Sequence, residues 1–441
     1  MDIGVVWAQF GPYHFARAAA LKKLAGRTRV HALELADRTA GYQWKRSEGA
    51  LELITLCPGS EAEKLAFRQV FLRARKAFAE LKLGVCILPS YAPKQSLAAL
   101  LAARSLGIRT VMMNETHQGT ARACGLAKLV KRQLVSMFDA ALVGGAPQRR
   151  YFASLGLPVE RIFAAYDAVD NDYFAQRAEE IRGQSSKFRD RYSLPEHYFL
   201  SLGRFVAKKN LSTLIKAYRL FLDSSQLKET HLVLVGSGEE GTRLRWLCHH
   251  LKLPLYDKTK VGPRHTSDDG KGPFAQPAAV TGTGSVAAQS KVPGVHFYGF
   301  RQIEENPVFY AFADAFILPS LWEEWGLVVN EAMASGLPVV VSETAGCAED
   351  LLEGGLPPNC ASTTSLSQAR DLQIEHRIRE NGLVFDPKAT GELSRILLFL
   401  ESSPRLRAIM GGESRRIVSK FSCEKFGENA LHAAQAALER R

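Results

Sequence analysis

The sequence predicts an α/β protein in which two doubly wound, parallel-sheet domains face a central cleft. Short apolar runs alternate with segments of helical period, which favours parallel sheets covered by helices. One alternating series begins at the N-terminus, and a second series begins near Tyr198. The strands are apolar almost throughout, as in sheets buried on both faces. Open parallel sheets bind ligands at the carboxyl ends of their strands, so the cleft is the expected site.

Length and composition are those of a globular protein. The chain has 441 residues, of which 46% are apolar and 23% charged, which excludes a disordered chain, a collagen-like repeat or a coiled coil as the main body. No apolar stretch is long enough for a transmembrane helix, and the N-terminus reads directly into a strand rather than a signal peptide. The 7 cysteines are scattered without a CxxC pair, which indicates reduced thiols, no zinc site and a cytoplasmic protein.

The net charge favours anionic partners. Lys and Arg number 57 and Asp and Glu 45, which gives +12. Nucleic acid, acidic lipid and phosphorylated ligands all fit such a surface, and the charge does not choose among them. No basic aromatic groove or nucleic-acid-binding module is apparent in the sequence, so we expect no nucleic-acid partner.

Apolar runs in the N-terminal domain, predicted over residues 1–180, read as strands. They are Ile3–Trp7, Val30–Leu35, Val85–Leu88, Arg109–Met113 and Ala140–Val143. Residues 61–82 predict an amphipathic helix. Its apolar stripe comprises Phe67, Val70, Phe71, Ala74, Phe78 and Leu81.

The second domain is predicted over residues 181–423. Its strands are Tyr198–Leu202, Leu232–Val235, Val295–Tyr298, Ala315–Leu318 and Val339–Val341. Residues 257–292 are rich in Gly, Pro, Ser and Thr without periodicity, which is typical of a mobile insertion; residues 356–378 form a second, weaker one. Residues 424–441 predict a C-terminal helix that crosses back to the N-terminal domain.

Two glutamates flank a glycine between a strand and a helix. The strand ends at Leu318, and a helix starts near Gly326. Its first turn exposes unpaired N–H groups to which a phosphate can bind, and the glycine permits close approach. Glu323 precedes this helix and Glu331 lies about two turns inside it, where sugar hydroxyls could donate hydrogen bonds to either carboxylate. Alternatively, Glu323 only caps the helix and Glu331 is solvated or salt-bridged.

A Gly-Arg pair follows the strand Tyr198–Leu202. Gly203 and Arg204 come directly after the strand, and Lys209 lies five residues beyond Arg204. Two cations beside the cleft can neutralise a diphosphate leaving group. Lys208 could take the place of Lys209 as the second cation. The alternative is a solvated basic loop. No acidic cluster has metal-ligand spacing, so we predict no metal.

These motifs resemble the retaining nucleotide-sugar glycosyltransferases of glycosyltransferase family 4 (glycosyl transferases group 1), which have the GT-B fold. The family's hallmark is two glutamates separated by seven residues, the spacing of Glu323 and Glu331. The resemblance implies that Glu323 contacts the donor sugar and Glu331 the ribose diol. It also implies diphosphate binding by Arg204 and Lys209. The backbone of the following residues should hold the distal phosphate: Trp325, Gly326, Leu327 and Val328.

Further turns complete the expected site. Gly236 follows the strand Leu232–Val235, and Phe300 follows Val295–Tyr298, where the family seats the base. On the acceptor side, Gly11 occupies the place of a glycine-rich loop in the family. His14 either donates to a phosphate or acceptor hydroxyl or is a helix-start histidine.

A second pair of acceptor-side candidates follows the strand Arg109–Met113. Glu115 and His117 lie there, and either can serve as a general base. No cofactor is expected, because the nucleoside diphosphate sugar is a co-substrate.

The predicted function is hexosyl transfer from a UDP- or GDP-sugar to a hydroxyl acceptor (a glycan, glycolipid or small molecule), with retention, in cell-surface polysaccharide or glycolipid biosynthesis. The alternatives are a GT-B epimerase or phosphorylase, and a non-catalytic binder of nucleic acid or membrane. Basic helices suggest peripheral contact with the anionic inner face of a membrane, although each can equally be a solvated face. Their cations are Lys64, Arg68, Arg75, Lys76, Lys128, Lys131 and Arg132.

Overall fold

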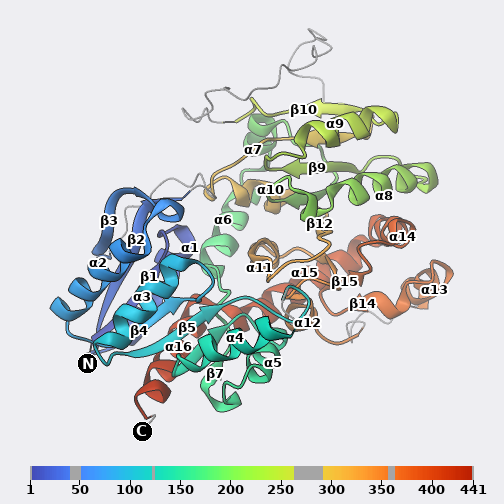
Figure 1. Cartoon of the computed structure of the whole chain (residues 1–441). Coiled ribbons are helices and arrows are strands. Elements are labelled where there is room, and N and C mark those ends of the chain that lie inside the picture. The colour runs from blue at the N-terminus through green and yellow to red at the C-terminus, as the bar shows by residue number, and fades with distance from the viewer. Residues whose placement is uncertain (1, 40–50, 122–124, 263–291, 356–362, 440–441) are drawn as a thin grey trace.

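The computed structural model contains two parallel-sheet domains, as predicted (Figure 1). It describes residues 2–39, 51–121, 125–262, 292–355 and 363–439. Most of the predicted insertion at 257–292 therefore lies outside the described residues. Helices cover both faces of each sheet, and apolar clusters fill the space between the helices and the strands. This arrangement places the carboxyl ends of both sets of strands toward the region between the domains.

The first sheet is parallel throughout, in the order β3-β2-β1-β4-β5-β6-β7. Its strands are β1 (Asp2–Trp7), β2 (Arg29–Arg38), β3 (Leu53–Glu61), β4 (Leu83–Pro89), β5 (Arg109–Asn114), β6 (Ala140–Val143) and β7 (Ile162–Phe163). The sequence patterns did not predict β3, whose second half contains Pro58 and Gly59 and ends in the polar Ser60 and Glu61, or β7, which is only two residues long. The strand order reverses between β1 and β4, which is the switch point where such sheets bind ligands.

The helices of the first domain are α1 (Pro12–Leu24), α2 (Phe67–Glu80), α3 (Lys94–Ser105), α4 (Leu126–Ser136) and α5 (Ala146–Ser154). The predicted helix over 61–82 begins later than expected, because Ala62–Lys64 form a separate 3-10 turn. Val70, Ala74 and Phe78 are buried as expected. Phe67, the first residue of the helix, is 37% exposed instead of buried.

The second sheet has the order β10-β11-β9-β8-β12-β13-β15-β14 and is parallel except for β14. Its strands are β8 (Tyr198–Leu202), β9 (His231–Val235), β10 (Leu255–Asp257), β11 (Val295–Phe297), β12 (Ala315–Leu318), β13 (Val339–Ser342), β14 (Ile378–Arg379) and β15 (Gly382–Phe385). The predicted insertion at 356–378 contains a helix, α13 (Thr363–Asp371), so that part of it is regular structure.

Helices α6 to α15 surround this second sheet. They are α6 (Asn171–Arg182), α7 (Ser185–Tyr192), α8 (Leu211–Ser224), α9 (Gly241–His250), α10 (Asn306–Phe312), α11 (Leu327–Ala334), α12 (Ala348–Leu351), α13, α14 (Thr390–Glu401) and α15 (Pro404–Val418). The long helix α6 packs against α10 and α11. Because α6 packs against helices of the second domain, the first domain ends before α6 begins.

The last helix, α16 (Cys423–Leu438), returns to the first domain, where it packs against α1, β5 and β6 (Figure 1). Its buried face consists largely of alanines, and the small side chains allow α1 to approach closely. A Cβ added at Gly427 would lie 3.1 Å from the backbone nitrogen of Leu21. Where the chain crosses between the domains, Val169 and Ser422 form a parallel bridge.

Candidate active site

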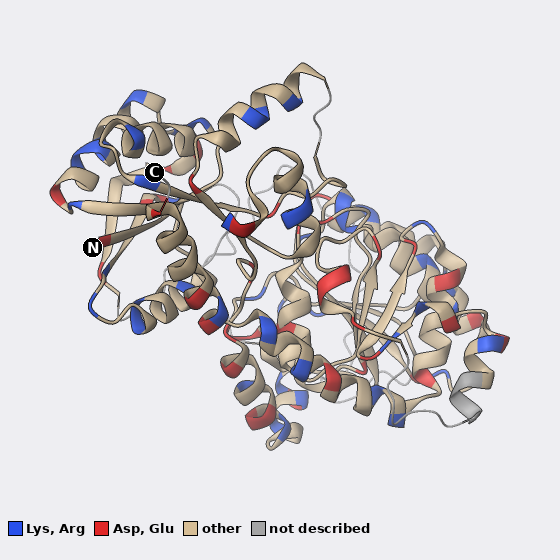
Figure 2. Cartoon of the chain, turned by 90° about the horizontal axis from the view of Figure 1, so that it is seen from below, with Lys and Arg blue, Asp and Glu red and all other residues tan. Residues whose placement is uncertain are grey.

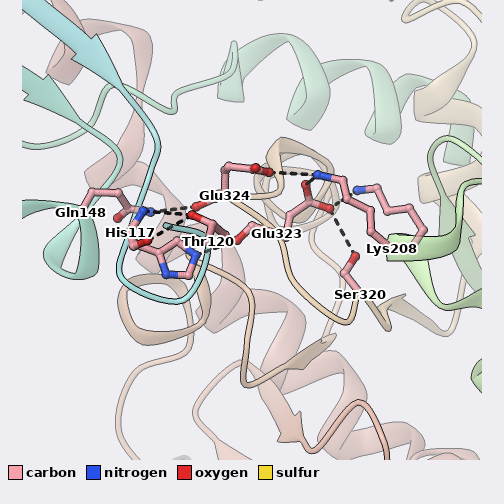
Figure 3. Close-up of polar contacts among 8 residues, drawn as sticks. His117, Thr120, Gln148, Lys208, Ser320, Glu323 and Glu324 are labelled. Carbon is pink, nitrogen blue, oxygen red and sulfur yellow. Dashed lines mark hydrogen bonds and ion pairs between the residues drawn. The ribbon is translucent and has the colours of Figure 1, made fainter. Parts of the chain in front are cut away.

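Glu323 lies in the loop that joins β12 to α11, and its carboxylate is satisfied by two lysines and a serine (Figure 3). Lys208 Nζ donates to Glu323 Oε1 at 3.0 Å, Lys209 Nζ donates to Oε2, and Ser320 Oγ donates to Oε2 at 3.3 Å. Glu323 is 7% exposed. Although burial raises its pKa, Lys209 and Lys208 hold the pKa below its ordinary value. The carboxylate is therefore ionised and paired with cations rather than held by the helix dipole.

Lys208 connects three groups of this loop. Besides Glu323, it donates to Glu324 Oε2 at 2.9 Å, and its ammonium lies 4.5 Å from the ring centroid of Trp322. Burial lowers the pKa of Lys208, but the two carboxylates reverse this and raise it. Both predicted lysines, Lys208 and Lys209, thus direct their ammonium groups at the loop that carries Glu323.

The turn that carries the lysines is tied to the Glu323 loop by Asn210. This residue has a left-handed φ of 53°, and its Nδ2 donates to the carbonyl oxygens of Pro319 at 3.0 Å and Pro387 at 2.8 Å. The amide therefore satisfies two buried carbonyls and fixes the distance between the two loops.

Glycines allow the turns after β8 and β9 to touch. A Cβ added at Gly236 would lie 1.9 Å from the carbonyl oxygen of Gly203, and Gly236 N donates to the carbonyl of Gly299 at 2.7 Å. Arg204 follows Gly203 and is exposed, whereas Phe300 follows Gly299 and is half-buried. The structure thus brings the predicted Gly203, Gly236 and Phe300 turns together at the carboxyl ends of β8, β9 and β11.

The N-terminus of α11 adjoins Glu323. Gly326 has a φ of 113°, and a Cβ there would lie 3.6 Å from Glu323 Cγ and 2.9 Å from Leu318 Cδ2. Leu327 and Val328, the first residues of α11, are half-buried. A left-handed glycine at this point turns the chain into the helix and leaves its first N–H groups without intrahelical partners.

Trp325 is part of the interface between the domains. Its side chain is 1% exposed, and its Nε1 donates to Asn330 Oδ1 at 2.9 Å. A Cβ added at Gly144 of the first domain would lie 2.7 Å from the indole ring. Only the backbone of Trp325 can therefore serve the predicted phosphate contact.

Glu331 is fully buried on α11, so that the solvated or salt-bridged alternative is wrong. Tyr310 OH and Asn306 Nδ2 donate to its Oε2 at 3.0 and 3.3 Å, and Tyr13 OH donates to Oε1. Tyr13 belongs to α1, so this bond crosses between the domains. Burial raises the pKa of Glu331 to about 7, although the hydrogen bonds oppose this.

His117 joins the first domain to the Glu323 loop (Figure 3). Gly119 N donates to His117 Nδ1 at 3.2 Å, which leaves the proton on Nε2, and Nε2 contacts the carbonyl oxygen of Glu323 at 2.9 Å. Glu115 lies two residues before His117, next to Asp167, and burial raises the pKa of both carboxyl groups.

His14 has the geometry of a helix-start histidine. Gly11 N donates to its Nδ1 at 3.0 Å, and its ring stacks on Trp7 with centroids 4.7 Å apart. Burial lowers the pKa of His14 to about 3, so the ring is neutral. Gly11 and His14 thus form one turn at the start of α1, and the structure does not bring them into contact with Glu323.

Several residues at this interface escaped the sequence analysis. Asp350 accepts hydrogen bonds from Ala146 N at 3.1 and 2.9 Å, at the first turn of α5. Gln148 Nε2 donates to the carbonyl oxygen of Glu324 at 2.8 Å. The glycine pair Gly144-Gly145 was a signal in the sequence for a close contact at this point. A Cβ at Gly145 would lie 2.1 Å from Asp350 Oδ2.

Lys and Arg are mixed with Asp and Glu over both domains (Figure 2), and nothing in this distribution favours the nucleic-acid alternative. Within the described ranges, no helix combines the length and apolar character that crossing a bilayer requires. The absence of a metal and of a cofactor remains a prediction.

The fold and the site together define a glycosyltransferase domain of the GT-B type. The family model described as glycosyl transferases group 1 matches residues 184–263, and a second model of that description matches residues 270–398. The part of the chain that these models of glycosyl transferases group 1 match carries Glu323, Glu331 and both lysines.

Known proteins of similar sequence and structure agree with this assignment. An uncharacterized glycosyltransferase of Methanocaldococcus jannaschii is 30% identical over 35% of this chain and 29% of its own length. The O-antigen chain mannosyltransferase B of Escherichia coli is 25% identical over 49% of this chain and 46% of its own. The chain therefore spans less than half the length of these relatives. The crystal structure of Anabaena HepE in complex with UDP-glucose is similar to this chain, with a TM-score of 0.63 and 16% sequence identity. The structural match covers 99% of this chain and 100% of the HepE chain.

Proposed function

We propose that this protein is a retaining hexosyltransferase that moves a sugar from a nucleoside diphosphate sugar to a hydroxyl acceptor. The observation that carries the proposal is the buried Glu323 carboxylate, held by Lys208 and Lys209 beside the glycine start of α11. A donor diphosphate needs cations and N–H groups, and a donor sugar needs a hydrogen-bond acceptor. All of these groups lie in this one region.

The donor would exchange partners with these side chains. In the structure, Lys209 is paired with Glu323. A bound diphosphate would attract Lys209 and the exposed Arg204, and Glu323 would then accept hydrogen bonds from the sugar hydroxyls. As the bond to the anomeric carbon breaks, negative charge grows on the departing phosphate, and cations already in place stabilise it. Retention would follow from attack on the face that the diphosphate leaves.

The names of the relatives support the choice of donor and pathway. HepE was crystallised with UDP-glucose, and the Escherichia coli relative is an O-antigen chain mannosyltransferase. We therefore propose a UDP- or GDP-sugar as donor and a role in cell-surface polysaccharide or glycolipid synthesis. A hollow of about 430 Å³ beside His117, lined also by Tyr151, Glu343 and Gly346, offers room for an acceptor.

Donor binding and turnover test this proposal directly. The thermal unfolding temperature should rise with UDP or GDP, because a ligand that binds only the folded state stabilises it. The matching donor sugar should then be consumed, and the product should keep the donor's anomeric configuration, which NMR can read. Glu323→Gln and Lys209→Met should abolish turnover, whereas Lys216→Met, at an exposed lysine on α8, should not.

Two results would overturn the proposal. One is turnover in Glu323→Gln or Lys209→Met equal to that of Lys216→Met. The other is a folded protein whose unfolding temperature moves with neither nucleotide.

Contact with an anionic membrane is a second part of the proposal, and α4 supports it. Leu126, Leu129 and Val130 are 82%, 55% and 58% exposed, and Lys128 and Arg132 on the same helix are exposed too. Exposed apolar and basic residues on one helix are typical of an interfacial helix. Flotation with vesicles of anionic lipid should therefore capture the protein, and Leu129→Glu should release it. Equal flotation with vesicles of neutral lipid would show that charge plays no part.

A further inference from the structure

A buried carboxyl group lies behind the acceptor side of the site and has no function in the proposal above. Asp167 follows β7 in the segment that leads to α6 and is 0% exposed. Neither of its carboxyl oxygens has a hydrogen-bond donor among the described residues. A Cβ added at Gly144 would lie 2.7 Å from Asp167 Oδ2, so a glycine is needed to make room for this carboxyl group. An ionised group buried in this way is strongly unfavourable unless something compensates for it.

The compensation is a second carboxyl group. The Glu115 side chain at the end of β5 lies within hydrogen-bond reach of Asp167. Two carboxylates only accept hydrogen bonds, so the pair makes none while both are ionised. One proton between them supplies the missing donor. Burial raises the pKa of both groups, and the charge of Glu115 raises the pKa of Asp167 further. These shifts favour a shared proton at neutral pH.

A buried arginine balances the remaining charge. Arg17 of α1 is 1% exposed, its Nε donates to the carbonyl oxygen of Ala168 at 2.9 Å, and its Nη2 has no partner within the described residues. Its positive charge lowers the pKa of Glu115 and of Asp167. Two carboxyl groups that share one proton carry a single negative charge, and Arg17 cancels it.

The other ionisable groups that face this pair leave that balance intact. From the second domain, Glu323 and Glu324 add negative charge that raises the pKa of Glu115 further. Tyr166 and Cys347 stay neutral, since burial raises the pKa of each.

We propose that Asp167 is a positioning residue for the acceptor side of the site: it shares one proton with Glu115, so that the pair carries a single negative charge, balanced by Arg17, where Glu115 faces the acceptor hydroxyl beside the donor diphosphate. The proposal rests on the function inferred above. Glu115 is partly exposed, whereas Asp167 is not, so only Glu115 can reach a ligand. Two bare carboxylates next to a diphosphate would repel it, and loss of the shared proton should therefore lower turnover.

Asp167→Asn is the decisive variant, because the asparagine amide donates to Glu115 permanently without a titratable proton. Consumption of the UDP- or GDP-sugar that the protein hydrolyses, with water as acceptor, would be measured between about pH 5 and 9. Wild-type turnover should fall by about tenfold per pH unit above the upper pKa of the pair. Asp167→Asn should remain active and lack this fall.

Infrared spectroscopy tests the shared proton without any substrate. A protonated carboxyl group has its own carbonyl stretch, so the difference spectrum between wild type and Asp167→Asn at neutral pH should contain one such band. Glu331 and Asp350 are present in both proteins and cancel. Glu115→Gln should lose the same band and provides the measurement if Asp167→Asn does not fold.

Asp139→Asn is the matched control. Asp139 is also buried, at 1% exposure, and accepts from Thr110 N at 2.9 Å in the first sheet, away from the pair. This variant should lose stability but keep both the band and the alkaline fall.

An Asp167→Asn protein with the wild-type pH profile and the wild-type band would overturn the inference. If wild type consumes no UDP- or GDP-sugar, the proposed function fails instead, and the infrared band still decides whether the proton is shared.

Discussion

Replacing Glu331 with glutamine should make the protein more stable relative to wild type as the pH rises. Burial raises the pKa of Glu331 from 4.5 to about 7. Below the ordinary value the carboxyl group is protonated in both the folded and the unfolded chain. Between the two values only the unfolded chain releases the proton, so the folded state loses stability as the pH rises.

The magnitude follows from the size of this shift. A change from 4.5 to about 7, at 1.36 kcal/mol per unit, corresponds to roughly 3 kcal/mol. Glutamine has the same shape but does not ionise, so Glu331→Gln lacks this pH-dependent loss. It also lacks one of the two acceptor oxygens that Tyr13 and Tyr310 use, which destabilises the variant by about 1–3 kcal/mol at every pH.

Thermal unfolding at about pH 5 and at about pH 8 separates the two effects. Each kcal/mol shifts the unfolding temperature of a domain of 150–250 residues by about 2–4 °C. Part of the loss is already present at pH 5, so wild type should lose about 5–10 °C more than Glu331→Gln between the two pH values. Equal losses in both proteins would refute the reasoning, because they would mean that Glu331 is not the group whose burial sets the pH dependence.

The remaining predictions concern the loops around this site. Gly346→Ala should lower both the unfolding temperature and donor turnover, because its Cβ would lie 1.9 Å from the carbonyl oxygen of Glu324; a fully active, stable variant would contradict this. Glu349→Ala should change the free energy of unfolding by less than about 1 kcal/mol, since its ion pair with Arg150 is 51% and 63% exposed, and denaturant titration would detect a larger change. The pKa of Glu323 lies below its ordinary value of 4.5, so its stabilising effect is present above that value and is lost as the pH falls through the folded pKa. Wild type should therefore lose more stability in acid than Glu323→Gln, and an equal loss in acid titrations of unfolding would count against the lysine pairs.

The sequence predicts the fold well where strands are buried on both faces. Runs such as Tyr198–Leu202, apolar except for Ser201, and Ala315–Leu318, apolar throughout, coincide with β8 and β12. Edge strands carry weaker signals: β3 ends in polar residues, and β14 is two residues long. Their positions are decided by pairing with a neighbouring strand, which no local pattern records.

The candidate site divides in the same way. Glu323, Lys208 and Lys209 belong to contiguous motifs, and the structure brings them into contact. The partner of Glu331 could not be predicted, because Tyr13 lies 318 positions away. Asp350 likewise acquires its partner Ala146 only when the two domains meet, and Asp167 comes to lie beside Glu115 only when β5 and β7 take their places in the first sheet.

The position of α16 has a consequence for biosynthesis. This helix fills the core of the first domain, where Phe426, Ala430 and Ala433 are all 0% exposed. The ribosome makes the first domain first, and domains generally begin to fold in that order. Here the N-terminal sheet must wait, with part of one apolar face uncovered, until α16 has been made, after the whole second domain. Loss of α16 should therefore damage the first domain although the helix follows the second domain in the sequence.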